Sequence, residues 1–384
     1  SDTARICAVA PVAAAPRRHH RTRQHIDKMQ RNQPLRDGHL SIVADAAKMV
    51  RFGQRHDAAA VRFRPANAQR HCLFADDLAI AALAVEGEQA AGIELPFVCG
   101  HETAGWVAEV GAGVTHISVG DAVLLHPLAT CGYCKACRAG DDMHCAGGVF
   151  PGLFAPGGFA EYVKTNARAV VPLKGNLTPV DVAPLGDAGL TAYRAVRKAL
   201  PLAVPGTRTV VLGAGGLGHI GIQALRALSQ TEIIVVDRSP EALEHARGWG
   251  ADHTVLARED RSHVQEVRDL TDGAGAEVVI DYVGEGGAER DGVELLGPNG
   301  VDFLVGYGGS LKVDILSQAL FPETSFVGNI CGNYGELVEL VALAARGAIR
   351  LTTTTFPLEG INEALHALDE GRMIGRGVLV PNGS

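Results

Sequence analysis

Apolar and polar positions follow two patterns along the chain, and each pattern predicts a different kind of structure. Just after Leu95, short β-type runs alternate with glycine turns. Thr103–Val110 and Ala122–Leu125 have the composition of strands, and the turns fall at residues 111–113 and 120–121. Short strands separated by turn residues are typical of β-rich folds. The sequence therefore predicts a compact β-rich domain here.

From Thr178 onward, apolar strands alternate with helical patterns. The strand-like runs are Thr209–Leu212, Ile233–Val236, Val278–Asp281 and Phe303–Gly306, and the helix-like runs are Leu217–Leu228 and Pro240–Trp249. Ser239 followed by Pro240 is a good helix start, because serine caps and proline fits the first turn. Alternating strands and helices predict an α/β fold, a doubly wound parallel sheet covered on both faces.

Residues 1–91 do not share either pattern, since they lack clear strand alternation and turn punctuation. Their formal net charge is +5, whereas the rest of the chain carries −13. A basic segment can indicate nucleic-acid binding. These arginines and histidines, however, form no helical face and have no interleaved aromatic residues, so we expect no nucleic-acid partner.

Amino-acid composition narrows the classes of protein to which the chain can belong. Hydrophobic residues make up 47% of the 384 residues, enough for two domains with cores. No uncharged apolar run reaches the roughly 18 residues of a membrane span, so we expect no membrane partner. Arg17, Arg18, His19 and His20 interrupt the apolar N-terminal stretch, which argues against a secretory signal. Four of the eight cysteines cluster and the others (Cys7, Cys72, Cys99 and Cys331) are scattered, which favours an intracellular metal cluster and the cytoplasm.

The clustered cysteines have the spacing Cys-x2-Cys-x2-Cys-x7-Cys. They are Cys131, Cys134, Cys137 and Cys145. Four thiolates on a tight loop can close a tetrahedron around zinc, whereas unpaired thiols in a polar loop would be a liability. Cysteine fills all four positions and leaves none for water or substrate, so the predicted zinc is structural.

A glycine-rich turn follows the predicted strand Thr209–Leu212. Gly213, Gly215 and Gly218 fit Gly-x-Gly-x-x-Gly, and Gly216 and Leu217 lie within the motif. The first glycine permits a tight turn, the second a close approach to pyrophosphate, and the third close helix packing. Asp237, followed by Arg238, ends the next strand, where a carboxylate binds adenosine ribose hydroxyls and repels a 2′-phosphate. The alternative is a glycine loop beside an ordinary aspartate. The full pattern favours an NAD site.

Two further polar positions are less specific. His101 and Glu102 form a Gly-His-Glu sequence just before a strand, and Asp187 lies near a predicted helix start. Taken alone, such a histidine is more often structural, and the aspartate could simply stabilise a helix N-terminus.

In this order, the Gly-His-Glu sequence, the cysteine loop and the nucleotide motif resemble the zinc-dependent alcohol dehydrogenases of the medium-chain dehydrogenase/reductase superfamily. The resemblance covers residues 92–382. It implies a GroES-like catalytic domain interrupted by a Rossmann domain. The implied boundaries are 1–91 for an anomalous N-terminal segment, 92–182 for the GroES-like domain, 183–330 for the Rossmann domain, and 331–384 for the return to the catalytic domain.

The resemblance also implies roles for particular residues. His101, Glu102 and Asp187 would belong to the catalytic zinc site, with the aspartate typical of a bacterial subgroup. Thr191 would lie near the nicotinamide and Arg376 would contact the pyrophosphate. Four more cofactor-lining positions are Val283, Gly284, Val305 and Gly306. A homodimer or homotetramer is implied, with Rossmann-domain edges pairing.

One family feature has no counterpart in the sequence. The family's first catalytic-zinc ligand lies in Cys-x-x-Asp-x-His, upstream of Gly-His-Glu, and neither Cys72 nor Cys99 fits that pattern. Cys72 or Glu102 could substitute, and we expect a catalytic zinc that is weakly bound or absent. The match resumes abruptly near Glu86, which suggests the hypothesis that the preceding residues are read in a wrong frame.

These features predict a zinc-dependent oxidoreductase that passes a hydride between an alcohol and NAD, giving an aldehyde or ketone. Its partner would be a small-molecule alcohol or carbonyl compound. Two alternatives stay open. One is a polyol dehydrogenase of the same superfamily, and the other is a non-catalytic NAD-binding protein with a structural zinc and a defective catalytic site.

Overall fold

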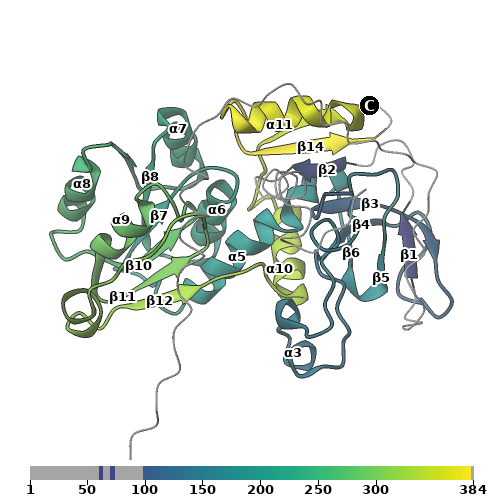
Figure 1. Ribbon diagram of the computed structural model, residues 1–384, viewed down its shortest axis with the longest axis horizontal. Coiled ribbons are helices and arrows are strands. Elements are labelled where there is room, and N and C mark those ends of the chain that lie inside the picture. Colours follow the sequence, from purple (N-terminus) through teal and green to yellow (C-terminus); the bar gives the residue numbers. More distant parts are fainter. Residues whose placement is uncertain (1–59, 64–69, 74–97, 382–384) are drawn as a thin grey trace, which may run out of the picture. The chain divides into compact units, whose positions relative to one another are not determined.

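A computed structural model describes residues 60–63, 70–73 and 98–381 of the chain. Two sheets organise these residues (Figure 1). Among them, no helix has both the length and the apolar character needed to cross a bilayer.

The first sheet is parallel and has six strands in the order β12-β11-β10-β7-β8-β9. The strands are β7 (Arg208–Leu212), β8 (Glu232–Asp237), β9 (His253–Leu256), β10 (Ala276–Asp281), β11 (Leu296–Leu304) and β12 (Ser325–Gly328). Strand order reverses between β7 and β10, which is the Rossmann arrangement, and ligands of such sheets bind beyond the carboxyl ends at that point. The predicted doubly wound parallel sheet is confirmed.

Helices cover both faces of this sheet, and alternate strand residues explain why. Val211 packs into a core with residues of α5, α6 and α10, whereas Val210 and Leu212 face a core that includes residues of α8 and α9. Successive side chains of a strand point to opposite faces, so a fully apolar strand requires two covers. The helices are α5 (Ala188–Ala199), α6 (Gly218–Leu228), α7 (Pro240–Trp249), α8 (Ser262–Leu270), α9 (Ala288–Leu295) and α10 (Tyr334–Ala345).

The second sheet has eight strands and is mostly antiparallel. Its main path is β13-β14-β2-β3-β1-β5, with β4 pairing β3 and β6. The strands are β1 (Ala60–Phe63), β2 (Arg70–Leu73), β3 (Thr103–Val110), β4 (Ala122–Leu125), β5 (Lys164–Asn166), β6 (Val170–Pro172), β13 (Thr353–Pro357) and β14 (Arg376–Val380). Helices α3 (Lys135–Arg138), α4 (Pro179–Val182) and α11 (Ile361–Asp369) accompany it. After α10 the chain returns to this sheet through β13 and β14 (Figure 1).

The element predictions were mostly accurate, and most predicted bounds differ from the observed ones by no more than two residues. Strands β3 and β4 and helix α7 have the predicted bounds, and the Ser239 side chain accepts a hydrogen bond from the Ala242 N–H at 3.2 Å. Strand β11, however, begins at Leu296 and ends before Val305. Strands β1 and β2 lie within the segment for which the sequence predicted none, because each is only four residues long and its pairing partners are distant in sequence.

A buried carboxyl group lies inside the parallel sheet. Asp302 in β11 is 0% exposed, and neither of its oxygens has a hydrogen-bond partner among the described residues. Burial raises the pKa of Asp302 to about 8, and the nearby Asp281 carboxyl acts in the same direction. Asp302 is therefore protonated at neutral pH. Keeping this carboxyl buried costs free energy, and that cost grows as the pH rises.

The pH dependence of stability follows from this shift. Between about 4, the usual pKa of aspartate, and about 8, the folded chain holds a proton that the unfolded chain has released. The free energy of unfolding therefore falls as pH rises across this window. Asp302→Asn should remove at least about 1 kcal/mol of that fall. Urea unfolding of the unmodified protein and of Asp302→Asn at several pH values checks this. If the free energy of unfolding changes with pH in the same way in both proteins, the prediction is wrong.

Candidate active site and nucleotide site

The glycine turn after β7 has the geometry that a nucleotide phosphate requires. Gly213 has φ of +91°, which a residue with a Cβ rarely adopts, and a Cβ on Gly218 would lie 1.9 Å from the Gly213 carbonyl oxygen. A Cβ on Gly215 would meet no atom within 4 Å, so its face of the turn is open. Helix α6 begins at Gly218 and directs its N-terminus toward this turn. The arrangement fits a pyrophosphate group.

Asp237 lies beside the glycine turn, at the end of β8. Its Oδ2 accepts a hydrogen bond from the Ala214 N–H at 2.7 Å, and its Oδ1 accepts one from the Ser239 N–H at 2.7 Å. Both bonds fix the carboxylate at the edge where a ribose would follow the pyrophosphate. Arg238 is exposed next to it.

The turns after β10 and β11 touch one another closely. A Cβ on Gly284 would lie 2.1 Å from the Gly306 carbonyl carbon, and a Cβ on Gly306 would lie 2.2 Å from the carbonyl carbon of Val283. The N–H groups of Val305 and Gly306 both donate to the Asp281 carbonyl oxygen at 2.9 Å. Four sequence-predicted cofactor positions therefore meet at one edge of the sheet, the edge that also holds the glycine turn.

A buried polar cluster lies where β3 and α5 begin. His101, Glu102 and Asp187 are 3%, 1% and 7% exposed, and His101 Nε2 is 3.3 Å from Asp187 Oδ2. Burial is the strongest single influence and opposes ionisation of Asp187, but the contact with His101, the positive charge of Arg376 and the other neighbouring groups together outweigh it and lower the pKa of Asp187. The Thr191 hydroxyl donates to Asp187 Oδ1 at 3.3 Å. Asp187 is the N-cap residue of α5 without a capping hydrogen bond from its side chain, so its carboxylate serves this cluster instead.

Glu102 has different partners from the adjacent His101. Its Oε1 accepts from the Ala188 N–H at 2.5 Å, and its Oε2 accepts from Arg376 Nη2 at 2.5 Å. Burial raises the pKa of the Glu102 carboxyl, and the positive charge of Arg376 opposes that effect. Arg376 also borders the glycine turn, since a Cβ on Gly216 would lie 3.0 Å from Arg376 Nη1. The guanidinium thus lies between the glycine turn and the His101–Asp187 cluster.

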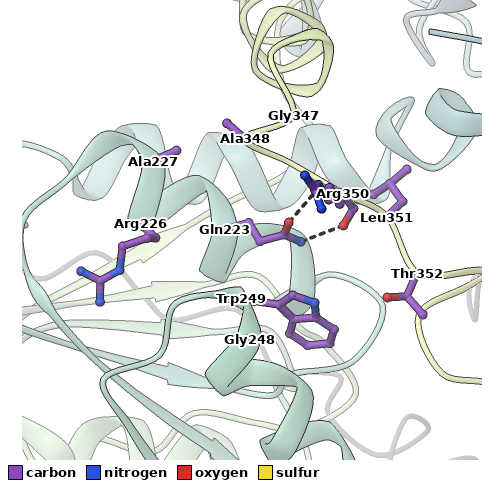
Figure 2. Close-up of a pocket in the computed structure, with 10 residues that line it drawn as sticks. All are labelled: Gln223, Arg226, Ala227, Gly248, Trp249, Gly347, Ala348, Arg350, Leu351 and Thr352. Carbon is purple, nitrogen blue, oxygen red and sulfur yellow. Dashed lines mark hydrogen bonds between the residues drawn. The ribbon is translucent and has the colours of Figure 1, made fainter. Parts of the chain in front are cut away.

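A cavity of about 430 Å³ lies apart from these groups, between α6, α7 and residues 347–352 (Figure 2). Gln223 in α6 both donates to the Arg350 carbonyl oxygen at 2.9 Å and accepts from the Arg350 N–H at 2.8 Å. The Thr352 carbonyl oxygen in turn accepts from the Arg376 N–H at 2.9 Å. None of the predicted site residues lines this cavity. Its border instead holds the chain segment that positions Arg376.

The four loop cysteines meet around one point. Their sulfur atoms all lie within 4.8 Å of one another, on the loop that contains α3. Backbone N–H groups of Cys134 and Cys131 point at the sulfurs of Cys131 and Cys145, each at 3.4 Å. The backbone N–H of Cys137 is the main cause that lowers the pKa of the Cys134 thiol to about 6. Clustered sulfurs, one of which ionises readily, fit a tetrahedral zinc.

The structure also brings in residues that the sequence did not single out. Segment 329–332 crosses the start of α5, where Asn329 Nδ2 donates to the Thr191 carbonyl oxygen at 3.1 Å. His126 Nε2 donates to the Gly332 carbonyl oxygen at 2.9 Å. The thiol of Cys331 forms a hydrogen bond with the Asp187 carboxylate. Cys331 is isolated in the sequence, so no local pattern predicted its contact with Asp187. Cys72 lies in β2, opposite Val378 of β14.

Comparisons with known proteins agree with this geometry. Residues 73–175 match the family described as "Alcohol dehydrogenase GroES-like domain", and residues 216–346 match the family described as "Zinc-binding dehydrogenase". An NAD-dependent alcohol dehydrogenase of Sulfurisphaera tokodaii is 37% identical over 293 residues, which are 76% of this chain and 83% of that protein.

Two other relatives extend the comparison. A D-arabinose 1-dehydrogenase (NADP(+)) of Saccharolobus solfataricus is 35% identical over 77% of this chain and 84% of its own length. The crystal structure of an alcohol dehydrogenase from Aeropyrum pernix superposes with a TM-score of 0.79 and 39% identity, covering 87% of this chain and 96% of that one. The chain belongs to the zinc-dependent alcohol dehydrogenase family of the medium-chain dehydrogenase/reductase superfamily.

Proposed function

We propose that this protein oxidises an alcohol to an aldehyde or ketone with NAD as the hydride acceptor, and runs the reverse reduction. The observation that carries the proposal is the placement of Arg376, which borders the glycine turn and pairs with Glu102 beside the His101–Asp187 cluster. Nucleotide-binding and metal-binding groups therefore converge on one guanidinium. Hydride transfer between a metal-bound substrate and a nucleotide requires the two sites to lie side by side in this way.

The bound groups would supply the chemistry that side chains lack. Zinc acts as a Lewis acid that lowers the pKa of an alcohol oxygen, and NAD accepts the hydride. His101 and Asp187 would hold the zinc, with Glu102 beside it and Thr191 near the nicotinamide. The nucleotide positions would be Gly213, Gly215, Gly216, Leu217, Gly218, Asp237, Arg238, Val283, Gly284, Val305, Gly306 and Arg376.

The chain's own residues orient these groups and keep water away. Burial of His101 and Asp187 excludes bulk solvent and strengthens every electrostatic interaction there. Glu102 uses both oxygens to hold Arg376 and the Ala188 N–H, which leaves two protein donors facing one another. Catalytic zinc sites usually have three protein ligands. We therefore propose a tight structural zinc on the four cysteines and a weaker zinc at the catalytic cluster.

A polyol or sugar dehydrogenase is the second candidate. It is favoured by the 35% identity to the D-arabinose 1-dehydrogenase of Saccharolobus solfataricus. That relative's printed cofactor is NADP(+), whereas the Asp237 carboxylate of this chain would face and repel a 2′-phosphate. The Asp237 position therefore favours NAD for either substrate class.

Cofactor-linked turnover tests the proposal directly. The zinc-loaded protein should produce NADH from at least one member of a panel of simple alcohols and polyols, and NADPH formation should be far slower. Asp237→Gly should weaken NAD binding and reduce the preference for NAD over NADP by at least about tenfold, because the repelling charge is lost.

Glu241→Gln is the matched control, since Glu241 is an exposed acid in the first turn of α7. It should leave the preference unchanged. Equal or tighter binding of NADP by the unmodified protein would contradict the role of Asp237. NAD binding without turnover of any substrate in the panel would contradict the enzymatic proposal and favour a non-catalytic NAD-binding protein.

We also propose that two copies pair through the edge of the parallel sheet. Strand β12 is an edge strand, and the adjoining helix Ile315–Leu320 presents apolar side chains to solvent. Ile315, Leu316, Leu320 and Phe321 are 76%, 55%, 61% and 76% exposed. Exposed apolar patches of this kind mark protein interfaces, and an open strand edge invites pairing.

Light scattering after size-exclusion chromatography measures this pairing. The unmodified protein should have the mass of a dimer or tetramer, and Phe321→Asp should shift it toward smaller species while NAD still binds. Val119 is 63% exposed on a different element, so Val119→Asp serves as the control and should leave the mass unchanged. A monomeric unmodified protein would overturn the proposal.

A further inference from the structure

Asp281, the last residue of β10, accepts hydrogen bonds from four backbone N–H groups in two separate turns. Its side-chain Oδ1 accepts from the N–H groups of Val283 and Gly284, at 2.8 and 2.9 Å. Its backbone carbonyl oxygen accepts from the N–H groups of Val305 and Gly306, both at 2.9 Å. These donors are the cofactor-lining positions predicted in the turns after β10 and β11. One residue therefore holds both turns.

The side chain of Asp281 is dedicated to the turn after β10. Asp281 is 0% exposed, and its second oxygen, Oδ2, has no hydrogen-bond partner among the described residues. Burial raises the pKa of the Asp281 carboxyl, and the hydrogen bonds from the Gly284 and Val283 N–H groups oppose that rise. An aspartate at a strand end often does no more than close a local turn. Asp281 differs because its backbone also holds the turn after β11, so both turns keep one shape together.

The two turns lie where the second half of a dinucleotide would bind. Strand order reverses between β7 and β10, and a dinucleotide spans such a reversal, with its pyrophosphate at the turn after β7. The glycine turn touches the turn after β10, since a Cβ on Gly213 would lie 2.8 Å from Val283 Cγ2. The Tyr282 hydroxyl donates to the Ala192 carbonyl oxygen at 3.2 Å, in the helix that carries Thr191. The turn after β10 is thereby fixed relative to both the glycine turn and α5.

We propose that Asp281 is a positioning residue for the nicotinamide riboside half of NAD, and that it acts by holding the turns after β10 and β11. The inference rests on the proposed function and adds a residue to its nucleotide site. Without Oδ1, the N–H groups of Val283 and Gly284 lose their acceptor and reorient toward other partners. The surface that faces the nicotinamide then loses its shape. The adenosine half, at the glycine turn and Asp237, does not depend on this contact.

Binding of NAD and of ADP, which lacks the nicotinamide riboside, separates this role from a general effect on the fold. Calorimetric titration of the zinc-loaded full chain with each ligand would compare the unmodified protein with Asp281→Ala. The variant should bind NAD at least about tenfold more weakly, but ADP within about twofold of the unmodified protein. Asp281→Asn keeps an oxygen acceptor at the same place and should bind NAD within about threefold of the unmodified protein.

Asp302→Ala is the matched control for loss of a buried carboxyl. Asp302 is a second fully buried aspartate of the parallel sheet, in the neighbouring strand β11, and neither of its oxygens has a hydrogen-bond partner among the described residues. This variant should change the affinities for NAD and ADP by less than about twofold. Thermal melting followed by circular dichroism establishes that each variant is folded at the temperature of the titration.

Hydrogen exchange of the unmodified protein gives a second readout that needs no variant. NAD should slow amide exchange in peptides that span residues 282–287 and 304–309. ADP should slow exchange at the glycine turn and Asp237 and leave those two peptides unchanged. Equal protection of the two peptides by both ligands would overturn the inference, whether or not Asp281→Ala folds.

The outcomes separate this inference from the proposed function. If Asp281→Ala weakens NAD and ADP equally, or weakens neither, Asp281 does not position the nicotinamide riboside and the proposed function stands. The same conclusion follows if Asp281→Asn loses as much NAD affinity as Asp281→Ala. If the unmodified protein binds neither NAD nor ADP, the nucleotide site of the proposed function fails together with the inference.

Discussion

The buried carboxylate of Glu102 has to be paired, because a lone charge at 1% exposure costs several kcal/mol. Its two oxygens accept hydrogen bonds from two elements that are far apart in sequence. One donor is the N–H of Ala188, the first residue of α5, and the other is the guanidinium of Arg376 at the start of β14. Arg376 at the same time borders the glycine turn of the proposed nucleotide site. Charge compensation at one position thereby fixes the distance between the start of β3, the start of α5 and the turn after β7.

Backbone hydrogen bonds also hold Arg376 in place. Its backbone N–H bonds to the Thr352 carbonyl oxygen, and Gln223 clamps the backbone of Arg350 in the same segment (Figure 2). One turn before Gln223 in α6, burial lowers the pKa of His219 to about 4 and keeps the ring neutral, and its Nδ1 lies 3.0 Å from the Gly215 carbonyl oxygen. The neutral ring adds no charge that would compete with Arg376 for a phosphate.

Local patterns in the sequence predicted the parts of the molecule that local interactions determine. The glycine turn, the helix start at Ser239 and the four-cysteine loop each lie within a short stretch, and each is found as predicted. The pairing of Glu102 with Arg376 spans 274 residues, and no periodicity carries such a contact. The same reason hides Cys331, which reaches Asp187 only through the crossing of segment 329–332, and strands β1 and β2, which are defined by distant partners.

If the Glu102–Arg376 pair couples the proposed nucleotide site to the proposed metal donors, a double-mutant cycle on NAD affinity measures that coupling. Calorimetric titration of NAD would compare the unmodified protein with Glu102→Gln, Arg376→Gln and the double variant. If Glu102 acts through Arg376, Glu102→Gln should weaken NAD binding about tenfold in the unmodified background and hardly at all once Arg376 is replaced. Equal losses from Glu102→Gln in both backgrounds would show that Glu102 does not act on NAD binding through Arg376.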